Sequence, residues 1–345
     1  MLNLALICGS WPPNLCGVGD YAHNLAAALR ERGANVSCLG EADSSSIRGG
    51  LKLSTSLTAG DFDLLHLQYP AIGFGRSLVP ALMPLRVRNR PFVVTLHEFS
   101  TFKKIRRPWF LAFAHQVSAR IFTNERERDT FSSIMRPTSG LDFVVPIASN
   151  IRVGNNTGRV PGSICNFGII SPGKGIEQFL ELAELCRDQP GLSFSLIGAE
   201  TKGFTDYARD ILTRARKLGV RAYLNLPELE VADLLSSHQY AYLPFDDGAS
   251  PRRGSLMAMQ QNRVAVLTTH SEQTPRSMRD TTIGVTSPSE ARDWILRFQA
   301  NPQELEQLRA RADQVQNPTW RGIATAHIDI YNRLLKRSIV AGDRQ

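Results

Sequence analysis

The chain has 345 residues, of which 42% are hydrophobic, and its 40 basic residues outnumber its 32 acidic ones. This composition is ordinary for a globular protein and excludes bulk disorder, and the length predicts two domains or one large one. No apolar run reaches the roughly 18 residues that a membrane-spanning helix needs. The basic excess is typical of proteins with anionic partners, such as nucleic acid, anionic membranes or phosphorylated substrates.

The N-terminus and the cysteines indicate a cytoplasmic protein. No basic segment precedes the first apolar run, so this run is interpreted as a buried strand rather than a signal peptide. The cysteines are five in number and show no C-x-x-C spacing. An odd count without paired spacing argues against a disulfide framework and against a zinc site, and it favours a reducing compartment.

The first half of the chain alternates apolar runs with helix-period segments. Residues 2–8 are apolar throughout, which is typical of a strand buried on both faces of a parallel sheet. A Gly/Pro-rich loop over 10–19 leads into a helix over 21–32, which Gly33 ends. Further strands are predicted over 35–39, 63–67, 92–97, 120–124 and 143–147. This alternation predicts the doubly wound α/β class.

The second half repeats the pattern after a candidate linker at 154–162, GNNTGRVPG. Helices are predicted over 175–188, 205–218 and 256–261, and a closing helix over 320–336. Strands are predicted over 163–168, 192–198, 222–226, 239–244 and 264–268. Because ligands bind beyond the carboxyl ends of parallel strands, candidate site residues are expected in the loops that follow these strands.

The first such loop is Asn14–Tyr21, between the first strand and the first helix. Gly17 and Gly19 would let a ligand approach the backbone, and the N-terminus of the following helix suits a phosphate. G-x-G without a third glycine is a weak dinucleotide signal, and no acid ends the next strand. A tight strand-to-helix turn is the alternative interpretation.

His97 and Glu98 follow the strand that begins at Phe92. A histidine at the carboxyl end of a buried strand is a candidate ligand contact, with a hydrogen-bonded structural histidine as the alternative. His66 lies one strand earlier between two leucines and is expected to belong to the core.

A third candidate is the Gly/Pro-rich loop at 168–175, which follows a strand and precedes a helix. Lys174, just before that helix, would hold an anionic phosphate together with the helix N-terminus. A lysine in a solvated turn is the alternative.

The fourth candidate, residues 244–256 (PFDDGASPRRGSL), is the richest. Two acids come first, then small residues, then Arg252 and Arg253, then a Gly-Ser entry into a helix. Arginines beside the N–H groups of a helix N-terminus suit a diphosphate, and an upstream acid could hold sugar hydroxyls. A charged surface turn accounts for the arginine pair but not for the helix entry behind it.

In this order, the segments resemble those of the GT-B glycosyltransferases, specifically the large retaining family 4, which uses nucleotide-sugar donors. Residues 13–29 are similar to the family's Gly-rich loop and first helix, and 94–98 to its T-x-H strand end. Residues 165–180 resemble the G-R-L-x-x-x-K-G segment, and 243–259 the P-S-x-x-E-G-F-G-x-x-x-x-E-A-M signature. Residues 320–335 resemble the closing helix. The loop within residues 244–256 also resembles that of a subgroup of these enzymes, which carries the motif D-G-A-S-x-R-R-G-S.

The resemblance implies two doubly wound Rossmann-like domains that face each other across a cleft, with a C-terminal helix crossing back to the N-terminal domain. The expected acceptor domain spans residues 1–153 together with the helix at 320–340. The expected nucleotide-sugar donor domain spans residues 162–318.

The resemblance also assigns roles. Gly17 and Gly19 would lie under the donor phosphates or the transferred sugar, and His97 would contact the sugar near the reaction centre. Lys174 would neutralise the diphosphate and Asp247 would hold sugar hydroxyls. The diphosphate would also meet the backbone of Gly254, Ser255 and Leu256.

Two family positions differ in this chain. The arginine five residues before the lysine is Ile169, and the carboxylate that usually grips the nucleotide ribose is Met257. The hypothesis is that Arg252 or Arg253 supplies the missing positive charge. Loss of the ribose carboxylate leaves the nucleotide base open, with a UDP- or GDP-sugar expected.

The implied reaction is retaining transfer of a hexosyl-type sugar to an acceptor hydroxyl, with no metal and no cofactor. Negative charge would build on the leaving β-phosphate, where Lys174, Arg252, Arg253 and the helix dipole would stabilise it. The absence of a D-x-D motif at a strand end fits metal independence.

A basic stretch in the first half remains to be explained. Residues 76–107 contain eight Lys and Arg but one acid, Glu98, with aromatic residues interspersed. Residues 76–110 are therefore a candidate contact with anionic lipid headgroups. This suits a lipid-linked glycan acceptor in polysaccharide, O-antigen or glycolipid assembly, and a peripheral position on the inner face of a membrane. A solvated face with a soluble sugar acceptor is the alternative.

Three other interpretations compete. A nucleic-acid binder would fit the charge, but no binding motif supports it, so no nucleic-acid partner is expected. A degenerate GT-B protein that binds a nucleotide sugar or a partner without transfer would fit Ile169 and Met257. An epimerase or a phosphorylase would share the fold. An epimerase, however, would need carboxylates near the leaving group, where this chain has arginines.

Overall fold

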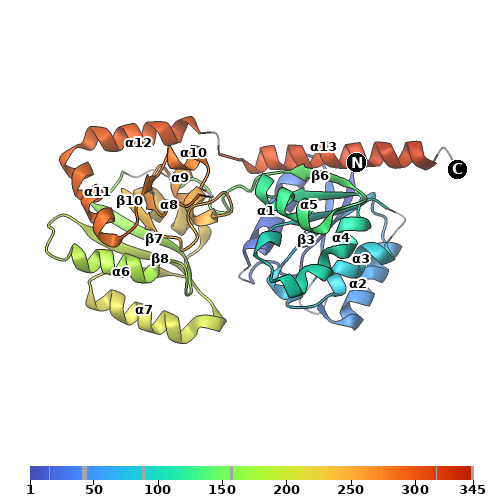
Figure 1. Ribbon diagram of the computed structural model, residues 1–345, viewed down its shortest axis with the longest axis horizontal. Coiled ribbons are helices and arrows are strands. Elements are labelled where there is room, and N and C mark those ends of the chain that lie inside the picture. Colours follow the sequence, from blue (N-terminus) through green and yellow to red (C-terminus); the bar gives the residue numbers. More distant parts are fainter. Residues whose placement is uncertain are drawn as a thin grey trace. The chain divides into compact units, whose positions relative to one another are not determined.

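The structure is a computed structural model that describes residues 1–14, 16–40, 45–87, 90–155, 158–272, 274–315 and 317–342. The chain divides into two compact units. Unit 1 comprises Met1–Ala148 and Pro318–Gln345, and unit 2 comprises Ser149–Asn317. Each unit is an α/β domain built on its own parallel sheet (Figure 1).

The described residues of unit 1 form a six-stranded sheet in the order β2-β1-β3-β4-β5-β6, with every neighbouring pair parallel. Strands β1, β3 and β4 are almost wholly buried, as their apolar sequences predict. The strands are β1 Asn3–Ile7, β2 Asn35–Leu39, β3 Leu64–Tyr69, β4 Phe92–Leu96, β5 Ala119–Phe122 and β6 Leu141–Val144.

Helices connect these strands and cover the sheet (Figure 1). Helix α1 buries Tyr21, Leu25 and Leu29, whose spacing of four places them on one face. The helices are α1 Gly17–Glu31, α2 Ile47–Ala59, α3 Val79–Arg86, α4 Leu111–His115, α5 Glu125–Met135 and α13 Trp320–Gly342. Short 3₁₀ turns are η2 Ile72–Phe74, η3 Phe99–Thr101 and η4 Lys104–Phe110.

Helix α13 follows unit 2 in the chain but packs in unit 1 against α1. Its residues Ile323, Ala324 and Tyr331 belong to the same hydrophobic core as β1 and β3. The predicted closing helix therefore exists and contacts the N-terminal domain, as the GT-B resemblance implies.

The described residues of unit 2 form a second six-stranded parallel sheet in the order β12-β11-β10-β7-β8-β9. Its strands are β7 Ser163–Ile170, β8 Ser193–Glu200, β9 Arg221–Leu224, β10 Tyr240–Leu243, β11 Ala265–Thr268 and β12 Ile283–Gly284. Its helices are α6 Ile176–Leu185, α7 Thr205–Lys217, α8 Glu228–Ser237, α9 Gly254–Gln261, α10 Arg276–Arg279, α11 Pro288–Ala300 and α12 Pro302–Gln314, with a 3₁₀ turn η5 Lys202–Phe204.

The boundary between the units falls earlier than the predicted linker at 154–162. The described part of that segment is bonded to unit 2: Gly154 N–H donates to Asn262 Oδ1 at 2.8 Å, and Arg159 donates to the carbonyls of His238 and Asn262 at 2.6 and 2.7 Å. These bonds satisfy backbone groups that a free linker would leave to water, so the segment belongs to unit 2. Residues 156 and 157 of the predicted linker lie outside the described residues.

Candidate functional site

In each sheet the order of the strands reverses at one point, where the chain begins to add strands on the other side, and ligands of doubly wound folds bind beyond the strand ends at this point. In unit 1 it lies between β1 and β3, and in unit 2 it lies between β7 and β10. The predicted site residues lie in loops that follow β1, β4, β7 and β10, in two groups that belong to different units.

The loops after β1 and β3 of unit 1 touch each other closely. A β-carbon on Gly73 would lie 1.7 Å from the Gly9 carbonyl oxygen, and Ser10 Oγ accepts a 2.8 Å hydrogen bond from Gly73 N–H. A β-carbon on Gly19 would lie 2.5 Å from the Ser10 carbonyl oxygen. Gly19 therefore allows α1 to pack against the first loop, which is a structural role. Gly17 faces open space, so its backbone stays approachable.

His97 lies at the end of β4, buried and hydrogen-bonded. Its Nε2 is 3.0 Å from Gln68 Oε1, and the ring of Tyr21 meets its ring edge-on with centroids 4.9 Å apart. Burial and the nearby His327 lower the pKa of His97 to about 3, so the imidazole is neutral at physiological pH. Because Nε2 faces a carbonyl oxygen, it carries the proton, and Nδ1 is left as an acceptor.

His66 is a core residue, as its leucine neighbours predict. It is fully buried, with Nδ1 2.7 Å from Tyr331 Oη and Nε2 2.7 Å from Thr95 Oγ1. The amide nitrogen of Gln68 lies 3.0 Å from His66 Nε2. Gln68 thus links His66 to His97, and through His66 the network reaches helix α13.

Two supporting residues of this group were not predicted from the sequence, Gln68 and Glu127. Buried Glu127 accepts hydrogen bonds from the N–H and hydroxyl of Ser100, at 2.8 and 2.5 Å. These bonds fix the loop that follows His97. Gln68 could have been noticed as a polar residue near the end of an apolar strand, LLHLQY, whereas Glu127 gave no signal because it lies on a charged helix.

In unit 2, the loops after β7 and β10 are in contact where the strand order reverses. The Asn166 side chain donates to the Tyr242 carbonyl at 2.9 Å, which joins the middle of β7 to the end of β10. Gly175 has φ +72°, and a β-carbon there would lie 2.2 Å from the Pro244 carbonyl oxygen. Exposed Lys174 immediately precedes this glycine. The glycine therefore brings the lysine loop against the start of the 244–256 loop.

The second loop carries a compact group of charges. Asp247 pairs with Arg252 at 2.5 Å and also with Arg253. The Arg253 guanidinium lies over the Phe245 ring, 4.5 Å from its centroid. The arginine side chains are only 23% and 17% exposed, so they are held in place rather than free in solvent. This pairing was not predicted from the sequence, which treated the acid and the arginines as separate ligand contacts.

Helix α9 begins directly behind these arginines, at Gly254. A β-carbon on Gly254 would meet nothing within 4 Å, so the first turn opens to space. The first N–H groups of a helix have no acceptor within the helix and carry partial positive charge. Gly254, Ser255 and Leu256 supply these groups here, while the side chains of Leu256 and Met257 are buried. Two arginines and a helix N-terminus in one place can bind an anionic diphosphate.

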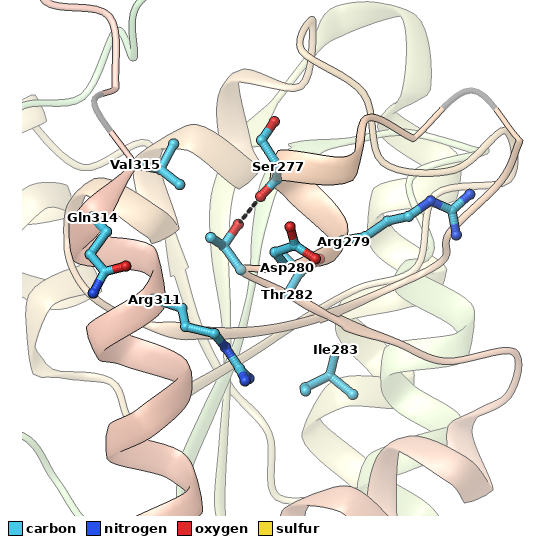
Figure 2. A pocket seen from close by; sticks show the side chains of 9 residues that line it. Ser277, Arg279, Asp280, Thr282, Ile283, Arg311, Gln314 and Val315 are labelled. Carbon is cyan, nitrogen blue, oxygen red and sulfur yellow. Dashed lines mark hydrogen bonds between the residues drawn. The ribbon is translucent and has the colours of Figure 1, made fainter.

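A surface pocket of about 560 Å³ lies elsewhere in unit 2, beside α10 and α12 (Figure 2). A 2.9 Å bond from Thr281 Oγ1 to the Ser277 carbonyl spans one wall. Arg279, at its rim, donates to the carbonyls of Ser271 and Thr274 and so holds a loop. None of the predicted site residues lines this pocket.

Among the described residues, no helix is both long enough and apolar enough to cross a membrane.

Comparison with known proteins finds similarity at the level of structure. No protein-family model matches the chain, and no curated protein sequence matches it. Sucrose-phosphate synthase from Thermosynechococcus elongatus is 15% identical, with a TM-score of 0.74 over 98% of this chain and 100% of that one. HepE from Anabaena, solved with UDP and glucose, is 14% identical, with a TM-score of 0.68 over 99% and 100% of the two chains.

A third similar structure is AviGT4, a glycosyltransferase involved in avilamycin A biosynthesis. It is 16% identical, with a TM-score of 0.61 over 97% of this chain and 98% of that one. At such identities the likeness concerns the fold, and it spans both units. The predicted fold class is thereby confirmed: the chain has the GT-B fold of glycosyltransferases.

Proposed function

We propose that this protein is a retaining glycosyltransferase that moves a hexosyl group from a nucleoside-diphosphate sugar to an acceptor hydroxyl. The observation that carries the proposal is the charge group in the loop after β10 of unit 2, where the strand order reverses and Arg252 and Arg253 precede the open N-terminus of α9. The similar protein HepE was solved with UDP, with UDP and glucose, and with UDP-glucose. This supports a nucleotide-sugar donor of the UDP type, with a GDP-sugar as the other candidate.

In the proposed reaction, the bond from the anomeric carbon to the β-phosphate oxygen breaks while a bond to the acceptor oxygen forms on the same face. The electron pair stays on the diphosphate, and the acceptor proton passes to that leaving group. Arg252, Arg253, Lys174 and the first N–H groups of α9 would stabilise the charge on the phosphate. Because these cations can neutralise a diphosphate by themselves, we propose that no metal takes part.

Asp247 has two roles in this proposal. Without donor it neutralises the arginines. When the diphosphate replaces it as their partner, the carboxylate can accept hydrogen bonds from sugar hydroxyls. The trio of Asp247, Arg252 and Arg253 carries a net charge of +1, so the group as a whole attracts an anionic diphosphate.

His97 would contact the transferred sugar as a neutral group. Its buried, neutral ring offers Nδ1 as an acceptor, while Gln68 holds Nε2. A neutral imidazole suits a sugar hydroxyl and does not add charge beside an oxocarbenium-like centre. Gly17, which faces open space in the same unit, would leave room for a ligand at the start of α1.

For the acceptor we propose a lipid-linked glycan, as in polysaccharide, O-antigen or glycolipid assembly, handled by a cytoplasmic protein at the membrane face. The basic stretch of unit 1 supports this choice. A soluble sugar acceptor is the competing possibility, and product analysis with both acceptor types separates them.

The test is a thermal-shift screen against UDP, GDP, ADP, dTDP and CMP and their common sugars, with and without EDTA. A ligand at 100 times its Kd should add about 2.7 kcal/mol to the stability of the folded state. We expect a shift with UDP or GDP that survives EDTA and disappears in Arg252→Ala/Arg253→Ala. Arg214→Ala/Arg216→Ala on α7, which removes two exposed arginines of the same unit, is the matched control.

Donor turnover separates the enzyme from a degenerate GT-B protein that binds without transfer. We expect the protein that binds a sugar nucleotide to release its nucleoside diphosphate, slowly with water and faster with an acceptor glycan. Binding without any release would favour the degenerate protein, for which Met257 in place of a carboxylate is the motivating observation.

A further inference from the structure

One surface of unit 1 combines basic and apolar side chains that the proposed reaction does not use. We call it the basic–apolar surface; it consists of Ile72, Arg76, Leu78, Leu82, Arg86, Lys103, Lys104, Ile105, Arg107 and Leu111. Residues 76–107 contain eight basic residues and one acidic residue, Glu98, so the surface is strongly positive. The surface also includes five exposed large apolar side chains: Ile72, Leu78, Leu82, Ile105 and Leu111.

The apolar members of this surface are unusually exposed. Ile105 is 83% exposed, Ile72 is 70% exposed and Leu111 is 51% exposed. Leu78, just before α3, and Leu82 on α3 are four residues apart and exposed, whereas Ala81 and Met83 are buried against the core. The outer face of α3 is therefore apolar, where a surface helix normally presents polar residues.

Contacts between the elements hold these side chains together. The Arg106 guanidinium lies between two rings, 4.8 Å from the centroid of Phe102 and 4.4 Å from that of Trp109. It also donates to the Gly75 carbonyl at 3.3 Å, which joins η4 to the turn after η2. Helices α3 and α4 are in contact beside it (Figure 1). The exposed apolar side chains therefore project from neighbouring, mutually braced elements.

We infer that the basic–apolar surface binds the face of an anionic phospholipid bilayer. Apolar side chains can enter the boundary between headgroups and acyl chains, while flanking lysines and arginines pair with phosphate. A nucleic acid offers phosphates but no apolar layer for Ile105 and Leu111, so the exposed apolar side chains favour lipid. The inference concerns binding alone and does not depend on the proposed sugar transfer.

Vesicle sedimentation of the full chain tests this inference. The vesicles contain either phosphatidylcholine alone or equal parts of phosphatidylcholine and phosphatidylglycerol. We expect binding to the mixed vesicles at low salt, much weaker binding to phosphatidylcholine, and loss of most binding at high salt.

Two variants separate the apolar part of the surface from the basic part. Ile105→Ser should weaken binding roughly 10- to 100-fold, because burying an isoleucine side chain is favourable by about 1.5–3 kcal/mol. Arg76→Gln/Lys103→Gln/Lys104→Gln should weaken it roughly 100-fold, because each basic residue near an anionic surface contributes about 1 kcal/mol.

Matched controls lie in unit 2. Leu229→Ser removes a 56% exposed leucine on α8, and a second control removes three exposed charges on α7, namely Arg214→Gln/Arg216→Gln/Lys217→Gln. Both controls should bind vesicles like the unaltered protein, and circular dichroism melts should show that all variants are folded. The inference is overturned if mixed vesicles are not bound at low salt, or if the α7 control loses as much binding as the surface variants. If Ile105→Ser binds vesicles as tightly as Leu229→Ser does, and the protein also binds a DNA duplex, the surface is a nucleic-acid site rather than a lipid site.

Discussion

Three buried histidines make unit 1 sensitive to acid. His66, His97 and His327 are buried in one region, where the rings of His66 and His327 lie 5.5 Å apart. Burial lowers the pKa of His97 to about 3 and that of His327 to about 4, and it lowers the pKa of His66 well below its ordinary value. All three are therefore neutral in the folded protein at mildly acidic pH.

The sign of the effect follows from proton uptake. The unfolded chain binds protons at these histidines below about pH 6.5, whereas the folded chain does not, so acid favours unfolding. At pH 5 each such histidine costs about 2 kcal/mol, because 1.5 pH units at 1.36 kcal/mol each separate that pH from the unfolded pKa. His97 and His327 together should cost about 4 kcal/mol, and His66 acts in the same direction. Above pH 6.5 this loss is absent.

Urea unfolding between pH 5 and 8 measures this loss. Trp11, Trp109 and Trp320 belong to unit 1 and Trp294 to unit 2, so tryptophan fluorescence reports mainly on unit 1. His327→Gln should reduce the slope of unfolding free energy against pH by about 1.4 kcal/mol per pH unit below pH 6. His238 and His270 of unit 2, whose pKa values burial also lowers, are common to both proteins and cancel in this difference. A slope unchanged by His327→Gln, or stability independent of pH from 5 to 6.5, would refute the reasoning.

Three further predictions concern the two candidate groups. Gly175→Ala should lower stability by about 1–3 kcal/mol in thermal melts, because Gly175 has φ +72° and the Pro244 carbonyl leaves no room for a β-carbon. Gly254→Ala is the control: its β-carbon would meet open space, so stability should change by less than about 1 kcal/mol. Equal losses in the two variants would contradict this. Asp247→Asn should keep the affinity for UDP or GDP within about threefold in calorimetry, because both arginines remain available to the diphosphate. The same variant should lower the rate of sugar transfer at least about tenfold, because hydrogen bonds from the sugar to the carboxylate are lost. Loss of nucleotide binding would show that the carboxylate itself is needed to form the diphosphate site. Gln68→Leu should destabilise unit 1 by about 1–3 kcal/mol, because it removes the buried hydrogen-bond partner of His97 Nε2. The variant should also lower kcat with little change in KM. A stability equal to that of the unaltered protein would show that this hydrogen bond is not formed.

The strands were largely predictable because a parallel sheet buried on both faces leaves continuous apolar runs. Asn35–Leu39 was predicted with its observed bounds, and β1 and β4 to within a residue at each end. Because ligands of such sheets bind beyond the carboxyl ends of the strands, the loops after the predicted strands pointed to Lys174, Asp247, Arg252 and Arg253 as candidate site residues. Helices α2 and α5 were not predicted. The residues that α2 buries include Gly49, Gly50 and Ser54, and α5 is mostly polar, so neither sequence shows a row of large apolar side chains.

The partners of the site residues were less predictable. Gln68 and His97 are far apart in sequence and meet because β3 and β4 are neighbours. The pairing of Asp247 with Arg252 and Arg253 depends on how the loop closes, which composition does not encode. Gly19 was predicted as a ligand contact, and its place beside Ser10 gives the glycine a packing role as well. The roles of Gly17, Gly19, His97 and Lys174 toward a donor stay predictions.

Isothermal titration of the protein with UDP and GDP, in the presence of EDTA, tests the central claim most directly. We expect one site per chain for one of the two nucleotides, with that binding lost in Arg252→Ala/Arg253→Ala but kept in Arg214→Ala/Arg216→Ala. Binding that persists in the first variant, or the absence of any heat with either nucleotide, would contradict a diphosphate site at the start of α9.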